Sequence, residues 1–281
     1  MSSVSVPAES SGNAVLSISD SEFRLFSAMI YRIAGISMGP AKKPLVASRL
    51  MKRVKHFGLS SYADYFQMIS EADQSGELQM AVDLLTTNET YFFREQKHFD
   101  FLQQSIIPSL APGQILNVWS AACSSGEEPY SVAMLAAQVM GSDRYRVMAS
   151  DLSTRVLEQA AQGIYPLSRT VNIPDHLLKK YCLKGIGTQE GKLMVDPELK
   201  RHVTFFQHNL NTSLSGQHAF DLILLRNVLI YFDADTKRRV IQHLLPSLKP
   251  GGYLFISHSE SLNGISHGLQ MVKPAIYRKA G

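Results

Sequence analysis

Hydrophobic positions near the start of the chain recur at the spacing of an α-helix. Ser19 and Glu22 have the spacing of a capping box, and apolar residues then follow every three or four positions as far as Gly35. The same period returns over residues 44–57, 62–69 and 77–85. We therefore expect a small all-α domain over residues 16–85. The Ser-rich segment before it, residues 1–15, is expected to be a disordered tail.

The pattern changes after residue 112, where short apolar runs alternate with helical segments. The runs predict strands near residues 115–119, 147–151, 203–207, 220–225 and 253–257. The fourth run is almost continuously apolar, as a strand must be when helices cover both faces of its sheet. A last run, 271–277, is expected to close the sheet as an edge strand because it contains Pro274. The alternation predicts an α/β fold with a doubly wound, mostly parallel sheet over residues 112–281.

Two segments interrupt this alternation. Residues 176–198 carry three glycines between short apolar runs, which predicts an antiparallel hairpin inserted into the sheet domain as a small β-subdomain. These glycines are Gly185, Gly187 and Gly191. Residues 86–111 are polar, then aromatic, then charged, and they continue into a helical stretch from Gln96 to Leu110. We interpret them as a linker between the two domains.

The strongest chemical signal lies between the first two predicted strands. The first strand leads through Gly126 into a helix, and the second strand ends at Asp151. A doubly wound sheet holds an adenosine in this way, because the glycine turn admits the ligand and the acid accepts the ribose hydroxyls. Glu127 and Glu128 at the start of the helix would repel the phosphates of a dinucleotide, although acids there also complement the helix dipole. S-adenosylmethionine, which has an adenosine and no phosphate, fits better than a dinucleotide.

Composition narrows the class of protein. The 281 residues are 45% hydrophobic and 19% charged, which is typical of a globular protein. No apolar run approaches the ~18 residues that a membrane span needs, and the N-terminus lacks the basic and apolar regions of a secretory signal. Cys123 and Cys182 lie far apart and in no metal-binding or disulfide pattern. We therefore expect a reducing, cytoplasmic location and no metal site.

The second predicted helix carries charges of one sign. Residues 42–56 contain no Asp or Glu. Their charged residues are all basic: Lys42, Lys43, Arg49, Lys52, Arg53 and Lys55. A solvated helix usually mixes both signs, because opposite charges three or four residues apart attract one another. The clustering therefore favours an acidic partner, and a merely solvated face is the alternative.

Four motifs resemble those of a known family, the bacterial chemotaxis receptor methyltransferases (the CheR family). The motifs are TTNETYFFRE at 86–95, WSAACSSGEEPYS at 119–131, ASD at 149–151 and RNVLIYF at 226–232. The resemblance extends from about residue 16 to the end of the chain. Members transfer a methyl group from S-adenosyl-L-methionine to glutamate side chains of chemoreceptors, and S-adenosyl-L-homocysteine is the product. The family fold is a small all-α domain, a linker, and an S-adenosylmethionine-dependent methyltransferase sheet with a small antiparallel β-subdomain.

The resemblance also implies roles for single residues. Cofactor contacts are expected at Asn88, Thr90, Arg94, Glu128, Asp151, Asn209, Leu210, Arg226 and Asn227. Tyr231 matches a tyrosine thought to lie beside the transferred methyl group, so Arg94 and Tyr231 are the candidate catalytic residues. No general base is expected, because a glutamate of pKa ~4.3 is already ionised at neutral pH.

The implied partner is the cytoplasmic helical domain of chemoreceptors. Its acidic surface is expected to meet Arg49, Lys52, Arg53 and Lys55. In family members the β-subdomain can also bind a short C-terminal receptor peptide as an added strand, and the turn with Gly185, Gly187 and Gly191 is the expected place here. The protein is expected in the cytoplasm, associated with membrane receptor arrays through the receptor. Neither nucleic acid nor direct membrane insertion is expected.

Two rival functions were weighed against this one. Methyltransferases that act on exocyclic amines or on cytosine carry a Pro-Pro or Pro-Cys pair after the fourth strand, whereas this chain has Arg226 and Asn227 there. A non-catalytic module could use the same fold only to hold a receptor. The presence of every expected cofactor residue argues against that alternative.

Overall fold

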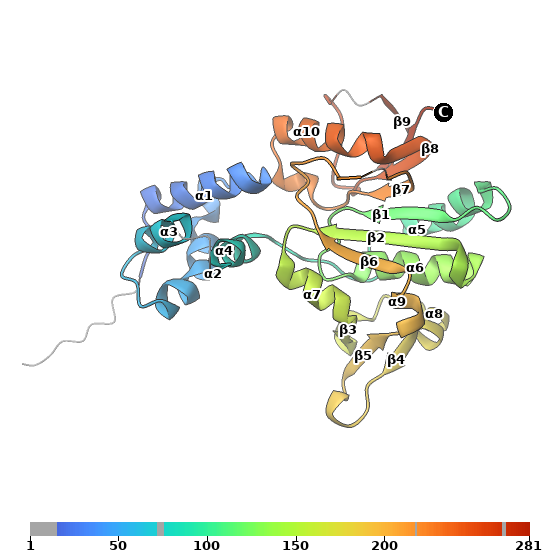
Figure 1. The fold of residues 1–281 in the computed structure, drawn as a ribbon, viewed down its shortest axis with the longest axis horizontal. Coiled ribbons are helices and arrows are strands. Elements are labelled where there is room, and N and C mark those ends of the chain that lie inside the picture. The colour runs from blue at the N-terminus through green and yellow to red at the C-terminus, as the bar shows by residue number, and fades with distance from the viewer. Residues whose placement is uncertain (1–15, 72–75, 217, 266–267) are drawn as a thin grey trace, which may run out of the picture.

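The computed structural model describes residues 16–71, 76–216, 218–265 and 268–281, so the expected tail lies outside the described residues. A bundle of helices stands beside a larger α/β domain, and an extended segment joins the two (Figure 1). Among the described residues, no helix combines the length and the apolar character that a membrane crossing requires.

The helical domain has the elements that the hydrophobic period predicts. They are α1 (Asp20–Ala34), α2 (Lys43–His56), α3 (Tyr62–Glu71) and α4 (Glu77–Leu85). The Ser19 hydroxyl accepts the Glu22 N–H at 3.2 Å and the Glu22 carboxylate accepts the Ser19 N–H at 2.7 Å, so the capping box is present. Gly35 ends α1 in the left-handed region, at φ 72°. Phe26 and Leu50 are fully buried between the helices, which gives this domain its own core.

The main sheet confirms the predicted fold class. Its strands are β1 (Leu116–Ser120), β2 (Tyr145–Asp151), β6 (Val203–Gln207), β7 (Phe220–Leu224), β8 (Leu248–Phe255), β9 (Leu269–Lys273) and β10 (Ile276–Lys279), in the order β6-β2-β1-β7-β8-β10-β9. The first five in this order are parallel, and β10 is antiparallel to both of its neighbours. The strand order turns back at β1. In such sheets ligands bind outside the carboxyl ends of the strands at this switch point.

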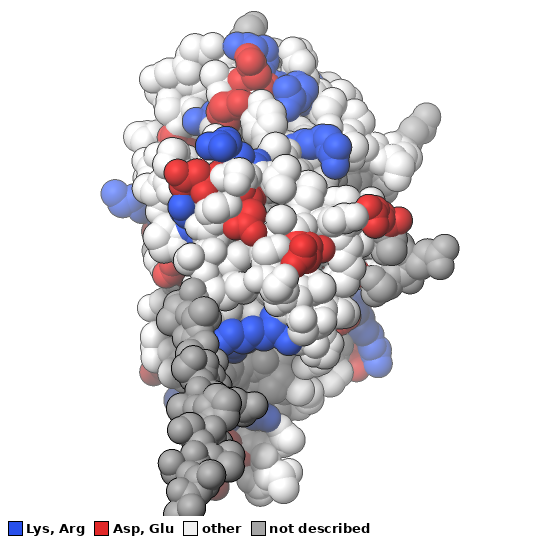
Figure 2. Space-filling model, turned by 90° about the vertical axis from the view of Figure 1, so that its left-hand side faces the viewer, with Lys and Arg blue, Asp and Glu red and all other residues white. Residues whose placement is uncertain are grey.

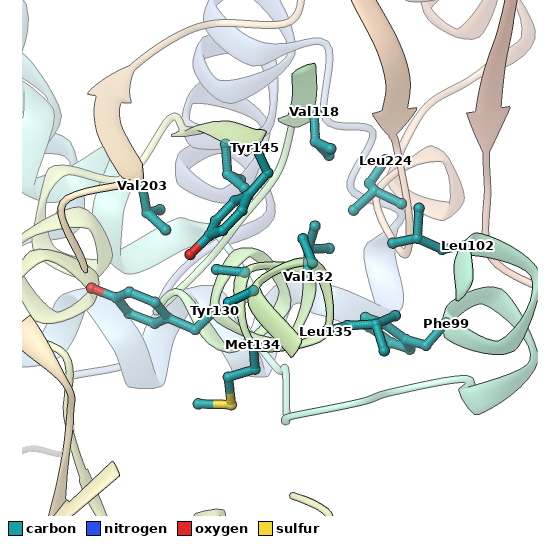
Figure 3. Close-up of a cluster of buried hydrophobic side chains, with 14 of the residues drawn as sticks. Phe99, Leu102, Val118, Tyr130, Val132, Met134, Leu135, Tyr145, Val203 and Leu224 are labelled. Carbon is teal, nitrogen blue, oxygen red and sulfur yellow. The ribbon is translucent and has the colours of Figure 1, made fainter. Parts of the chain in front are cut away.

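Helices cover both faces of this sheet (Figure 1). α5 (Gln96–Phe101) and α6 (Glu127–Met140) lie on one face, and α10 (Ala234–Leu244) lies on the other. α7 (Thr154–Gln162) packs near β6. Figure 3 shows Val132 of α6 between the sheet and the helix, with Val118 of β1 and Leu224 of β7 above it. Burial of each such side chain stabilises the fold by about 1.5–3 kcal/mol.

The small sheet has one strand more than the predicted hairpin. Its strands are β3 (Ile164–Pro166), β4 (Cys182–Lys184) and β5 (Lys192–Val195), all antiparallel in the order β3-β5-β4. Two short helices, α8 (Asp175–Tyr181) and α9 (Pro197–Lys200), flank it. β3 comes before the segment 176–198. It directly follows Gly163, which ends α7, and three residues are too few to show a strand period.

Two local predictions were wrong. The single closing strand is a hairpin of β9 and β10, because Pro274 and Ala275 form the turn and Ala275 adopts a φ of 64°. The helix predicted from Gln96 to Leu110 keeps α-helical bonding only in α5. It continues as a π-helical turn over Leu102–Ile106 and a 3₁₀ turn over Ile107–Ser109.

The two domains meet at the end of α1. Ser37 donates its N–H to the Tyr231 carbonyl at 2.9 Å, and Ile36 forms an isolated antiparallel bridge with Phe232. The approach at Gly35 is so close that an added Cβ atom would lie 2.4 Å from Cγ2 of Thr236. The backbone that carries Tyr231 is therefore in direct contact with the helical domain.

Candidate functional site

A large cavity lies between the helical domain and the carboxyl ends of the parallel strands. Its empty space, open mouth included, is about 1170 Å³. Part of the wall comes from the helical domain, at Ala34, Ile36, Ser37, Met38 and Lys42. All ten residues that the sequence assigned to the cofactor or the methyl group also line it: Asn88, Thr90, Arg94, Glu128, Asp151, Asn209, Leu210, Arg226, Asn227 and Tyr231. They come from the linker, the start of α6 and the ends of β2, β6 and β7.

Asp151 ends β2 and points its carboxylate across the switch point. Oδ2 accepts the Ser124 N–H at 2.8 Å and Oδ1 accepts the Ser153 N–H at 3.0 Å. Burial raises the pKa of Asp151, and these two hydrogen bonds act in the opposite direction. Each carboxylate oxygen can accept more than one hydrogen bond, so the side chain can still receive a pair of ligand hydroxyls.

The two acids at the start of α6 differ from each other. Glu127 is fully buried, forms an ion pair with Arg169 and does not line the cavity. Glu128 lines the cavity, where Arg226 donates to it at 2.7 Å and Ser120 donates to it at 2.7 Å. Neither acid stands alone at the helix end, so the argument from phosphate repulsion applies to Glu128 only in part and to Glu127 not at all.

Gly126 has a packing role that the sequence did not indicate. Its φ of 94° lies in the region that favours glycine. An added Cβ atom would lie 2.8 Å from Cβ of Ala160 and 3.0 Å from the hydroxyl oxygen of Tyr165. The glycine therefore lets α6 approach α7 and β3, and it is not among the cavity residues.

The linker is held in place by the sheet domain at several points. Ser124 donates to the Asn88 carbonyl at 2.8 Å, and Ser131 accepts the Phe93 N–H at 2.9 Å. Phe93 and Glu95 adopt φ values of 54° and 61°, which are uncommon for residues with a side chain. Strained backbone of this kind persists where the surroundings fix it, and here the surroundings form the cavity wall.

Arg94 offers a cationic group to the cavity. Its guanidinium donates to the Glu89 carbonyl at 2.9 Å and lies 5.4 Å from the ring centre of Tyr91. In the described parts of the chain it has no carboxylate within ion-pair distance. It is therefore free to form a charge-assisted bond to an anionic group of a bound molecule.

Tyr231 is half-buried at the edge of the same cavity. Burial raises the pKa of its hydroxyl, while Thr87 and the charges of Arg94 and Arg49 act in the opposite direction. The phenol is therefore protonated at neutral pH and can donate a hydrogen bond. The sequence did not indicate that a histidine, His208, shares this wall. Burial lowers the pKa of His208, so its ring is neutral at pH 7.

The basic residues of α2 divide into two groups. Arg53 binds the buried Glu77 through two hydrogen bonds of 2.7 and 2.5 Å, and Arg49 donates to the Leu85 and Thr86 carbonyls at 3.0 and 2.9 Å. By contrast, the remaining two of the four predicted receptor contacts, Lys52 and Lys55, are exposed. The outer end of the helical domain carries acidic and basic side chains interspersed (Figure 2). The one-signed appearance of this segment in the sequence is thus only partly a property of the surface.

A second hollow adjoins the linker. Three of its lining residues are arginines, namely Arg49, Arg155 and Arg169, and none is acidic. Thr86 and Asn88 line both this hollow and the large cavity. The sequence did not indicate this cluster, because its members lie on three separate elements.

The glycines of the β-subdomain are explained by the turn itself. An added Cβ atom at Gly185 would lie 1.9 Å from the Gln189 carbonyl oxygen, and Gly187 and Gly191 have φ values of 58° and 82°. The turn exposes Ile186, at 84% of its possible surface. None of these glycines lines either cavity.

Comparison with known proteins gives a consistent result. Residues 21–86 match a family model described as CheR methyltransferase, all-alpha domain, and residues 88–277 match one described as CheR methyltransferase, SAM binding domain. The chain is 38% identical over 281 residues to chemotaxis protein methyltransferase 2 of Pseudomonas aeruginosa. The alignment covers 98% of this chain and 99% of that protein. It is 38% identical over 268 residues to the chemotaxis protein methyltransferase of Escherichia coli, with coverage of 93% and 92%. The corresponding protein of Borreliella burgdorferi is 37% identical over 279 residues, with coverage of 95% and 97%.

Proposed function

The chain belongs to the CheR methyltransferase family, and on that premise we propose how its cavity works. The cavity binds S-adenosylmethionine, and the protein methylates glutamate side chains of chemoreceptors, leaving a glutamate methyl ester and S-adenosylhomocysteine. One observation carries this proposal. The residues that the family motifs assigned to cofactor and methyl group are scattered from Asn88 to Tyr231, yet they line one cavity.

The charges of the wall suit this cofactor. S-adenosylmethionine carries a sulfonium, an ammonium and one carboxylate, and it has no phosphate. Asp151 and Glu128 offer acceptors to the ribose hydroxyls and the cationic groups, and Arg94 offers a donor to the carboxylate. A partly buried carboxylate such as Asp151 disfavours a second anion beside it.

The chain supplies positioning and desolvation to the reaction. When bound, S-adenosylmethionine contributes an electrophilic methyl carbon. The receptor glutamate is already ionised at neutral pH, so no residue of this chain must remove a proton. Arg94 orients a carboxylate, the protonated Tyr231 donates a hydrogen bond near the reacting atoms, and the wall formed by both domains excludes water.

The receptor is proposed to reach this cavity along a basic path. Lys52 and Lys55 of α2 attract the acidic surface of the receptor's cytoplasmic helical domain. The hollow between Arg49, Arg155 and Arg169 continues this positive potential beside the linker. Contact with the receptor would bring the protein to membrane receptor arrays.

The β-subdomain is proposed to tether the protein to a C-terminal receptor peptide. β4 is an edge strand of the small sheet, so its outer side can pair with an added strand. Tethering would raise the effective concentration of the methyltransferase at the receptor. Titration of C-terminal receptor peptides by calorimetry tests this. The matched control is the β4 variant Lys184→Pro, because bonds to β5 involve Tyr181 and Gly185, so the N–H of Lys184 faces the free edge where a strand would add. If no such peptide binds, the hairpin is structural.

Transfer of a labelled methyl group tests the main proposal. The protein is incubated with receptor-containing membranes and S-adenosylmethionine labelled in its methyl group, and modified peptides are then mapped by mass spectrometry. We expect the label on glutamates of the receptor, as an ester that alkali removes. Asp151→Asn is the matched control, because it should lose most of the transfer at low cofactor concentration. Label on other residues, or cofactor binding without transfer, would contradict the proposal.

A further inference from the structure

A hydrogen-bonded relay runs behind the cavity wall from Glu95 to Asn227. The Ser257 hydroxyl donates to Oε1 of Glu95, with an oxygen-to-oxygen distance of 2.6 Å. The same hydroxyl oxygen accepts from Nδ2 of Asn227 at 2.8 Å. Ser257 is only 1% exposed, so water has little access to the relay.

Glu95 determines the direction of this relay. Burial opposes its ionisation, but the hydrogen bond from Ser257 and the charge of Arg226 lower the pKa of Glu95 to about 2. An ionised carboxylate can only accept hydrogen bonds. The single hydroxyl proton of Ser257 is therefore used by Glu95, and the hydroxyl oxygen can only accept from Asn227. The NH₂ group of the amide must face Ser257, which leaves its carbonyl oxygen on the opposite branch.

The backbone beside the relay is fixed as well. Asn227 adopts a φ of 58°, in the left-handed region. Glu260 accepts the Asn227 N–H at 3.1 Å and the Ser257 N–H at 2.8 Å. The two residues are thus held together through both backbone and side chain, and the remaining freedom of Asn227 is rotation of its amide by 180°.

The same neighbourhood does not suit a metal ion. Glu95, His98 and His258 place their ligand atoms within 4.8 Å of one another. However, the two imidazole rings stack at 4.6 Å with an angle of 21° between them, so their lone pairs run nearly parallel and do not converge. Arg226 lies 3.2 Å from the Glu95 carboxylate and already balances its charge.

We propose that Glu95 and Ser257 are positioning residues that make Asn227 a hydrogen-bond acceptor in the cofactor cavity. This inference rests on the proposed cofactor site, whose wall includes Asn227. The partner of the Asn227 carbonyl oxygen is a donor of the bound molecule, which is either the α-ammonium or the adenine amino group of S-adenosylmethionine. A freely rotating amide would offer its NH₂ group equally often and would bind the cofactor carboxylate as readily.

A hydroxyl series gives the first test. The dissociation constant of S-adenosylhomocysteine is measured by calorimetry for the full chain and its variants. Ser257→Ala should weaken binding about tenfold, whereas Ser257→Thr, which keeps the hydroxyl, should stay within about threefold. Ser261→Ala is the matched control, because its exposed hydroxyl accepts the Asn263 N–H at 3.0 Å and has no bond to Ser257, Glu95 or Asn227. Equal affinity of the Ser257→Ala variant and the wild type would overturn the proposal.

A double variant tests the direction of the relay. Asn227→Asp places a carboxylate, which can only accept, against the Ser257 oxygen. The Ser257 hydroxyl already donates its proton to Glu95, so neither oxygen can donate to the other, and binding should weaken about tenfold or more. Adding Glu95→Gln supplies an amide donor to Ser257 and frees its proton, so the double variant should bind more tightly than Asn227→Asp alone. A structural role of Glu95 predicts that the losses add, and that result would overturn the inference. Failure of the wild type to bind S-adenosylhomocysteine would instead refute the proposed function.

Discussion

Two arginine–glutamate pairs, each with one buried partner, lie in different parts of the molecule. In the helical domain Arg53 binds Glu77, and in the cavity wall Arg226 binds Glu128 at 2.7 Å. Both acids are further satisfied by a hydroxyl group, from Tyr65 in the first pair and from Ser120 in the second. The two pairs are similar in geometry, but only the second lines the large cavity between the domains. An arginine–carboxylate pair therefore indicates a binding site only where the surrounding fold leaves room for a ligand.

The largest effect is expected from Arg226→Ala. The change leaves Glu128 and Glu95, whose side chains are 11% and 17% exposed, without this cation, which should lower the free energy of unfolding by about 3–5 kcal/mol. It should also weaken S-adenosylhomocysteine binding by about 100-fold or more, because the cavity wall loses its arrangement. Denaturant unfolding and calorimetry measure the two effects. Arg226→Lys keeps the charge but not the planar donor group, so its stability and its affinity should lie between those of the wild type and Arg226→Ala. If Arg226→Ala changed only the stability or only the affinity, Arg226 would not serve both the fold and the cavity.

Arg53→Ala should separate the two pairs. The Arg53 side chain is 24% exposed, so the loss of unfolding free energy should be somewhat smaller, about 2–4 kcal/mol. Cofactor affinity should stay within about twofold, because neither residue lines the proposed cofactor cavity. Replacing both partners, with Arg53→Met and Glu77→Leu, should recover much of the stability. Unchanged stability together with slower receptor methylation would mean that Arg53 is a receptor contact after all.

Asp151→Asn tests the cofactor side of the comparison alone. The isosteric amide keeps the shape of the side chain but removes a charged acceptor, so S-adenosylhomocysteine binding should weaken by about 1.5–3 kcal/mol. The measurement is calorimetry on a variant whose unfolding has been checked. An unchanged dissociation constant in the folded variant would remove Asp151 from the cofactor site.

A smaller effect is expected at the exposed lysines of α2. Reversing both charges, with Lys52→Glu and Lys55→Glu, should raise KM for receptor methylation about three- to tenfold at low salt, and the difference should shrink as salt is added. Cofactor affinity and stability should not change. The matched control reverses two exposed lysines elsewhere, Lys97 and Lys179, with the same change in net charge. If both double variants behave alike, α2 is only a solvated face.

The smallest effect is expected from pH. The single-turnover rate should be nearly flat from about pH 6 to 8.5, because the receptor glutamate is already ionised in this range. His208 lines the cavity, and burial lowers its pKa, which favours the neutral ring over this range. Tyr231 is protonated throughout because burial raises its pKa, and Tyr231→Phe should lower the rate about tenfold at every pH. A limb near pH 6.5 that disappears in a His208→Gln variant would show that a general base takes part.

The sequence predicted most of the elements and ten of the residues that line the cavity. The elements follow from local patterns, such as the capping box at Ser19 or the strand end at Asp151, whereas most of the cavity residues were implied by the resemblance to the family. The partners of α2 could not be predicted in this way, because Arg53 meets Glu77 on a different helix and the packing of α2 against α4 decides the contact. β3 escaped prediction because three residues carry no period, and the role of Gly126 depends on Ala160, which only the tertiary structure brings near.

The contact between the two domains at Gly35 has a consequence for chimeric proteins built from members of this family. The residues that follow it, from Ile36 to Lys42, form part of the cavity wall, and Ser37 bonds the backbone of Tyr231. A chimera that exchanges helical domains between relatives therefore also exchanges part of the cofactor pocket. Such an exchange should change cofactor affinity together with the receptor contacts proposed for α2. The sheet domain expressed alone would lack the part of the cavity wall that the helical domain supplies. It should therefore bind the cofactor weakly and show little methyl transfer.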